Sequence, residues 1–124
     1  MNPHIPALLA RAEQTLETAR HILATGDAES AINRTYYAAF YAATAALLSI
    51  GEQPGSHAGT LSRFQALFVA TGKVPAEAGR SLRRAFDLRQ GVDYDFAASF
   101  STTTAAGLVD EVEYVVRIIK QLTS

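Results

Sequence analysis

The sequence predicts an all-α protein, a single domain folded as a mostly antiparallel bundle of about five helices. Apolar residues recur at steps of three and four along most of the chain, which is the spacing of one face of a helix. An alternating strand pattern never persists beyond a few residues. The 124 residues fall in the common size range of one domain, and neither a repeat nor a linker divides them. Residues 1–124 are therefore expected to share one hydrophobic core.

Two long helices are expected in the first half of the chain. Apolar positions from Ile5 to Leu23 predict the first helix, which Gly26 closes. Asp27 is a favourable N-cap for the second helix, which continues to Gly51. The second helix is rich in alanine, and because these side chains are small, a neighbouring helix can approach it closely.

Three further helices are expected after a turn at residues 52–56. Ser56 can cap the third helix. Pro75 suits the first turn of the fourth helix, and Gly91 is expected to end it. Ser101 opens the last helix, whose apolar positions have the spacing of a seam in a helical bundle.

Composition excludes several functional classes. The formal net charge is -1, so nucleic-acid binding would need a local basic patch. With no cysteine there is no disulfide, no thiolate nucleophile and no cysteine zinc site, and no histidine spacing indicates a metal. The longest apolar run, Tyr36–Ile50, is shorter than the roughly 20 residues that span a bilayer. We expect a cytoplasmic protein without a signal peptide, membrane segment, metal or cofactor.

A polar stretch follows the fourth helix pattern, from Arg89 to Phe96. Arg89 continues the apolar stripe of that helix, so its side chain is expected to face inward. An inward arginine needs a carboxylate, and Asp93 or Asp95 could supply one across the turn expected at Gly91. The simplest interpretation is a structural clasp between the helix end and the following loop.

A second polar group lies on the second helix and at the start of the third. Asn33 and Tyr37 are one helical turn apart beside the apolar stripe. His57 stands at a helix start, where the helix dipole lowers the pKa of a histidine. These residues form either a packing face or a surface for a base, a nucleotide or a second subunit.

Three segments together resemble the HEPN superfamily: AINRTYYAAF at 31–40, SHAG at 56–59, and FDLR at 86–89 followed by Asp93 and Tyr94. The branch most similar to this chain is that of small stand-alone prokaryotic HEPN proteins. The resemblance implies a helical bundle that forms a homodimer and is often encoded beside a minimal nucleotidyltransferase in a toxin-antitoxin pair. Many members are metal-independent endoribonucleases, in which an arginine and a histidine roughly four to six residues later meet across the dimer interface.

Arg89 occupies the arginine position of that motif, but Tyr94 stands where the histidine is expected. A tyrosine hydroxyl has an ordinary pKa near 10, so it is a poor general base at neutral pH. The sequence therefore favours a HEPN-type binding module over an enzyme. The alternatives are a metal-independent endoribonuclease that uses Arg89 with His57 or Tyr94, and a purely structural dimerisation module. The predicted cleft accepts a nucleotide, RNA or a partner protein and is lined by Asn33, Tyr37, His57, Arg89, Asp93 and Tyr94.

Overall fold

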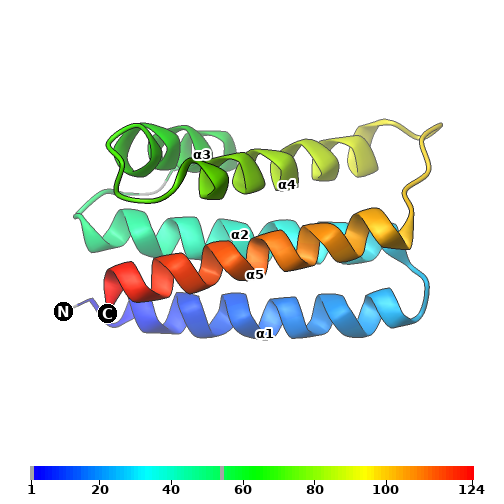
Figure 1. Ribbon diagram of the computed structural model, residues 1–124, viewed down its shortest axis with the longest axis horizontal. Coiled ribbons are helices and arrows are strands. Elements are labelled where there is room, and N and C mark those ends of the chain that lie inside the picture. The colour runs from blue at the N-terminus through cyan, green and yellow to red at the C-terminus, as the bar shows by residue number, and fades with distance from the viewer. Residues whose placement is uncertain (1, 54) are drawn as a thin grey trace.

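A computed structural model describes residues 2–53 and 55–124 of the chain. This part contains helices and no strand, which confirms the predicted all-α class. The third expected helix begins as an α-helix and continues as a π-helical segment, η1. In chain order the elements are α1 (His4–Ala24), α2 (Ala28–Ser49), α3 (His57–Phe64), η1 (Gln65–Val69), α4 (Ala76–Tyr94) and α5 (Thr102–Thr123), as Figure 1 shows.

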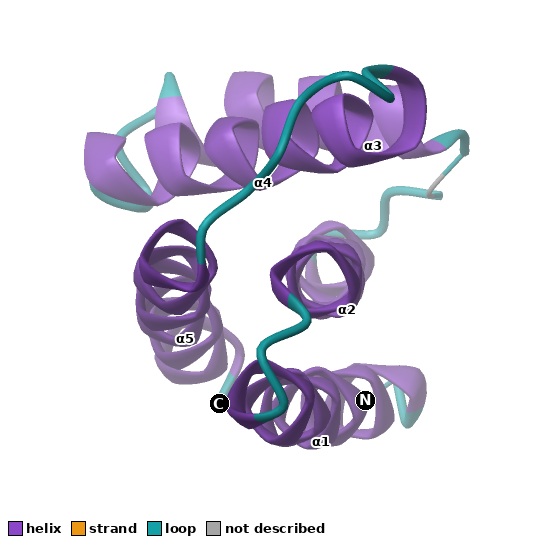
Figure 2. Cartoon of the chain, turned by 90° about the vertical axis from the view of Figure 1, so that its right-hand side faces the viewer, coloured by secondary structure: helices purple, strands orange, loops and turns teal. Residues whose placement is uncertain are grey.

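Helix α2 occupies the middle of the bundle. In both views α1 lies on one side of α2, and α3 and α4 lie together on the opposite side (Figures 1 and 2). Helix α5 lies beside α2 and contacts α1, α2 and α4. Consecutive long helices run antiparallel, as predicted, and the two ends of the chain lie at the same end of the bundle.

The helix boundaries follow from local chemistry. Asp27, Ser56 and Ser101 each accept a hydrogen bond from the backbone N–H three residues further on, so the three predicted N-caps are confirmed. Gly26 and Gly51 have φ values of 89° and 79°, and they follow the ends of α1 and α2. Glycine adopts this left-handed conformation without the steric penalty of a Cβ atom.

The prediction that Gly91 ends the fourth helix is wrong, because α4 continues to Tyr94. Gly91 serves a different purpose: a Cβ atom at this position would lie 3.1 Å from Cζ of Phe100. The glycine thus leaves room for a side chain of the loop that follows α4. Pro54, in the turn expected at residues 52–56, lies outside the described residues.

The core combines small alanines with large side chains, among them Ile32 on α2 and Leu108 on α5. Ala12 on α1, and Ala39 and Ala43 on α2, are at most 1% exposed, which confirms that the alanines let helices approach closely. Phe64 and Phe68 are also buried, and their rings stack with centroids 5.2 Å apart. This packing fixes α3 and α4 against α2, where the polar residues of interest meet.

Candidate functional site

The candidate site lies where α2, α3 and α4 meet. The guanidinium carbon of Arg89 lies 4.8 Å from the ring centroid of Tyr36 and 5.6 Å from that of Tyr37, within the range of cation-π attraction. The hydroxyl oxygen of Tyr36 lies 2.8 Å from Nδ1 of His57. Arg89 and His57, which are far apart in the sequence, therefore converge on one tyrosine.

Aromatic residues of α2 hold the imidazole of His57. The Ser56 cap starts α3 at His57, and this brings the ring against α2. The imidazole packs on Phe40 with centroids 4.1 Å apart, and it meets Tyr37 edge-on at 5.8 Å. Together with the hydrogen bond between Tyr36 and His57, these contacts fix the orientation of a half-buried histidine.

Burial and charge alter the titration of the two hydrogen-bonded groups. Burial lowers the pKa of His57, and the positive charge of Arg89 lowers it further. The direction of this shift confirms the sequence prediction, but burial is its main cause and not the helix dipole. Burial also raises the pKa of the Tyr36 hydroxyl, an effect that the charge of Arg89 opposes. At neutral pH the site therefore holds a neutral imidazole beside a protonated tyrosine.

The hydrogen bond with Tyr36 determines what Nε2 of His57 can do. If the Tyr36 hydroxyl donates to Nδ1, then Nε2 carries the ring proton and is a donor. If Nδ1–H donates to the hydroxyl oxygen, then Nε2 has a lone pair and is an acceptor. The arrangement thus combines a proton donor or acceptor with a guanidinium, which is the chemistry required to bind or transform a phosphate.

Arg89 pairs with Asp93, but the pair leaves part of the guanidinium unsatisfied. Nε of Arg89 lies 3.4 Å from Oδ2 of Asp93, one turn further along α4, and the two side chains are 21% and 31% exposed. The predicted clasp therefore lies within the helix, and Asp93 rather than Asp95 is the partner. The N–H is not aimed at the carboxylate, so Nε is buried without a hydrogen-bond partner among the described residues. Such an orphan donor is unusual and is consistent with a ligand site.

The structure brings four of the six predicted site residues together: Tyr37, His57, Arg89 and Asp93. Asn33 is half-buried and lies one turn from Tyr37 on α2, at the edge of the cluster. Tyr94 is the last residue of α4 and is 72% exposed. It follows Arg89 by five positions and so lies on a different face of the helix.

Tyr36 is the site residue that sequence reasoning missed. The apolar stripe of the second helix includes it, and its side chain is indeed only 4% exposed. A signal for its second role was present, because a buried tyrosine hydroxyl normally requires a hydrogen-bond partner. His57 is that partner.

The functional groups assembled at Tyr36 are a hydroxyl, an imidazole and a guanidinium.

Residues 2–53 and 55–124 contain no group of three or more histidine or acidic side chains placed to hold a metal ion. Among the helices of the same residues, none has both the length and the apolar character to cross a membrane.

The fold and the site define a small all-α domain with an arginine and a histidine that meet beside its central helix. The family model of the HEPN domain matches residues 5–122. The chain therefore belongs to the HEPN domain family, as its sequence resemblance predicted.

Relatives support the same assignment. The chain is 35% identical over 118 residues to a UPF0332 protein of Thermotoga maritima, and the match covers 90% of this chain and 89% of that protein. It is 34% identical over 90 residues to a "Putative toxin" of Methanocaldococcus jannaschii, covering 73% and 67% of the two chains. A second protein of that organism with the same description is 32% identical over 88 residues, covering 71% and 60%. This HEPN-type domain is thus similar to proteins described as toxins.

Proposed function

We propose that the chain is a HEPN-type binding module that takes RNA or a nucleotide at the site formed by Tyr36, Tyr37, His57, Arg89 and Asp93. The observation that supports this proposal is the convergence of Arg89 and His57 on Tyr36. The side chain of Arg89 is 21% exposed, and a guanidinium suits a phosphate because its planar N–H groups match the phosphate oxygens. The half-buried ring of Tyr37 offers a face or an edge to a base.

The binding proposal is tested with a fluorescently labelled single-stranded RNA of about 12 nucleotides, a length within the site sizes of known single-strand binders. Fluorescence anisotropy should show binding by the wild type. Arg89→Gln should weaken it about tenfold or more, because a hydrogen bond to a charged group contributes on the order of 1.5 kcal/mol. Arg117→Gln is the matched control, because Arg117 lies on α5 and pairs with Glu113.

Thermal unfolding of the same variants separates binding from structure. If Arg89→Gln melts near the wild-type temperature and loses RNA binding, the site has a binding role. If Arg89→Gln unfolds the protein, the structural interpretation of Arg89 is favoured and the chain is better described as a dimerisation module. Failure of the wild type to bind RNA or a nucleotide at any salt concentration would contradict the proposal.

The proposed assembly is a homodimer that pairs with a minimal nucleotidyltransferase in a toxin-antitoxin-like system. The family resemblance and the toxin descriptions of two relatives support it. Tyr94 at the end of α4 and Phe96 in the following loop are 72% and 90% exposed, and large aromatic side chains so exposed often pack against a partner. Light scattering tests the dimer, and copurification with the product of a neighbouring nucleotidyltransferase gene tests the pair. A strictly monomeric protein without such a neighbour would contradict this assembly.

A metal-independent endoribonuclease is the second candidate, and the position of His57 favours it. In this candidate His57 takes the role of the missing histidine of the family motif, and the contact of His57 and Arg89 with the same tyrosine supports this role. In this reaction Nε2 of His57 takes the proton of an RNA 2′-hydroxyl, and the 2′-oxygen bonds to phosphorus. The bond from phosphorus to the 5′-oxygen breaks, and the proton passes to that oxygen. Arg89 stabilises the charge on the phosphoryl oxygens.

Incubation of the pure protein with RNA in EDTA tests this reaction. Cleavage should disappear in His57→Gln, although that variant should still bind RNA through Arg89. Tyr94→Phe is the matched control, and it should cleave like the wild type because Tyr94 lies on another face of α4. If the wild type leaves RNA intact over a wide range of protein concentrations, the enzyme candidate fails and the binding proposal stands.

A further inference from the structure

A polar groove lies between α1 and α2, outside the site already described. Its volume is about 270 Å³. Every lining side chain is polar, two are arginines, and none is a carboxylate. The lining residues are Arg11, Gln14, Thr15 and Thr18 from α1, and Arg34 and Tyr41 from α2.

Among the described residues, no carboxylate lies within 4 Å of the two arginines of the groove. Of the eleven lysines and arginines, seven lie within 4 Å of a carboxylate in the described residues. Arg11 and Arg34 are two of the remaining four, and they face one groove. This local charge contrasts with the overall net charge of -1. It supplies the basic patch that anion binding by a chain of this composition requires.

Tyrosines connect the groove to the Arg89 site. Arg11 lies 5.7 Å from the ring centroid of Tyr41, and Arg34 lies 5.7 Å from that of Tyr37. The two tyrosine rings are one helical turn apart, with centroids at 6.3 Å. Tyr37 also contacts Arg89, so the same ring lies against Arg34 of the groove and Arg89 of the site.

This row of arginines and tyrosines occupies the side of α2 that no helix of the described residues covers. In Figure 2, α5 stands beside α2 on one side, and the other side is open. Ala39 and Ala43, on the opposite face of α2 from Tyr37 and Tyr41, are at most 1% exposed. Arg34, Tyr37 and Tyr41 are only half-buried, so their polar atoms can reach a ligand.

We propose that the groove is a second anion-binding subsite, in which Arg11 and Arg34 bind a phosphate of the same RNA strand whose neighbouring phosphate lies at Arg89. This inference rests on the proposed function. It narrows the proposed ligand from RNA or a nucleotide to an RNA strand. Three guanidiniums lie against two tyrosine rings of α2, Arg34 and Arg89 at Tyr37 and Arg11 at Tyr41. Several positive charges gathered in this way suit a ligand with repeated phosphates. The tyrosine rings between them favour a strand that carries bases over an acidic peptide.

The experiment compares two ligands, the labelled RNA of about 12 nucleotides and AMP. Arg11→Gln and Arg34→Gln should each weaken RNA binding by about threefold to tenfold and reduce the slope of log affinity against log salt by about 0.7 for each lost phosphate contact. Binding of AMP, which has one phosphate to place at Arg89, should be unchanged. Arg80→Gln on α4 is the matched control, because Arg80 also lacks a carboxylate within 4 Å among the described residues and lies outside the groove.

The outcomes distinguish the groove from the proposed function. If Arg89→Gln loses RNA binding while Arg11→Gln and Arg34→Gln bind RNA like the wild type, the groove inference is overturned and the proposed function stands. If Arg80→Gln weakens RNA binding equally, overall charge is responsible and the inference is again overturned. If the wild type does not bind RNA, both proposals fail. Arg11 is exposed, so its variant should remain folded even if Arg34→Gln does not.

Discussion

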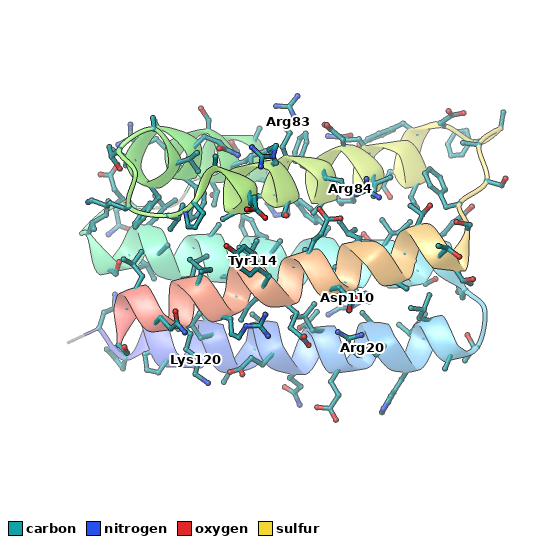
Figure 3. All side chains as sticks on the ribbon, in the orientation of Figure 1. Arg20, Arg83, Arg84, Asp110, Tyr114 and Lys120 are labelled. Carbon is teal, nitrogen blue, oxygen red and sulfur yellow. The ribbon has the colours of Figure 1, made fainter. Side chains whose placement is uncertain are left out.

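Two charged regions of this domain use their arginines differently. Along the seam between α1 and α5, Arg20 donates hydrogen bonds to Asp110 and Glu113 at 3.1 Å, and Lys120 lies 3.3 Å from Glu13. Arg20, Asp110 and Lys120 are labelled on the face of the bundle seen in Figure 3. Between α2 and α4, Arg89 has tyrosine rings on one side and a single, poorly aligned carboxylate on the other.

The difference indicates which charges serve the fold and which remain available to a ligand. In the seam, the exposed cations Arg20 and Lys120 are matched by carboxylates of the neighbouring helix. At the Arg89 site and in the groove of Arg11 and Arg34, aromatic rings hold the guanidiniums in place without fully occupying their hydrogen-bond donors. The Arg89 site and the groove therefore keep donors for an anion. Variants in these two places should lose ligand affinity, whereas variants in the seam should lose only stability.

The largest effect on stability is expected where α4 packs on η1, because this contact positions the helix that carries Arg89. A Cβ atom at Gly79 would lie 2.6 Å from Oε1 of Gln65 and 2.8 Å from Cγ2 of Val69. Gln65 also donates a hydrogen bond to the carbonyl of Gly79. Gly79→Ala should therefore lower the free energy of unfolding by about 1 to 3 kcal/mol, measured by urea denaturation.

Gly107 on α5 is the matched control for Gly79. A Cβ atom there would have no neighbour within 4 Å. Gly107→Ala should raise the free energy of unfolding by about 0.4 to 1 kcal/mol, because alanine restricts the unfolded chain and favours the helix. Equal effects of the two substitutions on the free energy of unfolding would show that the close packing of α4 on η1 at Gly79 does not matter for stability.

A smaller effect is expected from the titration of His57. Because the pKa of His57 in the folded protein is below its ordinary value of 6.5, the unfolded chain binds this proton more readily. The contribution of His57 to stability is therefore complete above about pH 6.5 and is lost as the pH falls through the lower folded value. Urea denaturation between about pH 7.5 and 5.5 should show this decline, before most carboxylates titrate.

His57→Gln should flatten that decline, because the substituted side chain does not titrate. His21→Gln on α1 is the control, since His21 is exposed and far from Arg89 in the fold. The His21 variant should retain the decline of the wild type. A decline that survives in His57→Gln would mean that another group is responsible and that the burial of His57 has little influence on its titration.

The fold was largely predictable because its determinants are local. The periodic apolar positions define the helices, and the caps at Asp27, Ser56 and Ser101 act within a single turn of chain. Gly91 could not be interpreted in this way, because it looks like a helix terminator in the sequence. Its actual role depends on Phe100, which approaches it only after the loop has folded back.

The candidate site was predictable only in part. The helical stripe placed Arg89 on the inner side of α4, and spacing made Asp93 a candidate partner. Whether His57 would reach Arg89 could not be read from spacing, because it depends on how α3 packs against α2. Tyr36 connects the two residues, and only the folded chain shows that a core position can also hold the histidine.

The smallest expected effect comes from Arg20→Gln in the seam between α1 and α5. The substitution removes two ion pairs, but the Arg20 side chain is 42% exposed and water screens the interactions. The free energy of unfolding should fall by only about 0.2 to 1 kcal/mol. The difference from the wild type should vanish in salt of about 1 M, where the screening length is near 3 Å. RNA affinity should remain at the wild-type value, since Arg20 lies in the seam between α1 and α5 and already hydrogen-bonds Asp110 and Glu113 through one of its nitrogens. A loss of RNA affinity comparable with that of Arg89→Gln would show that the arginines of the two regions contribute alike to RNA binding, and the distinction between the two regions would then be wrong.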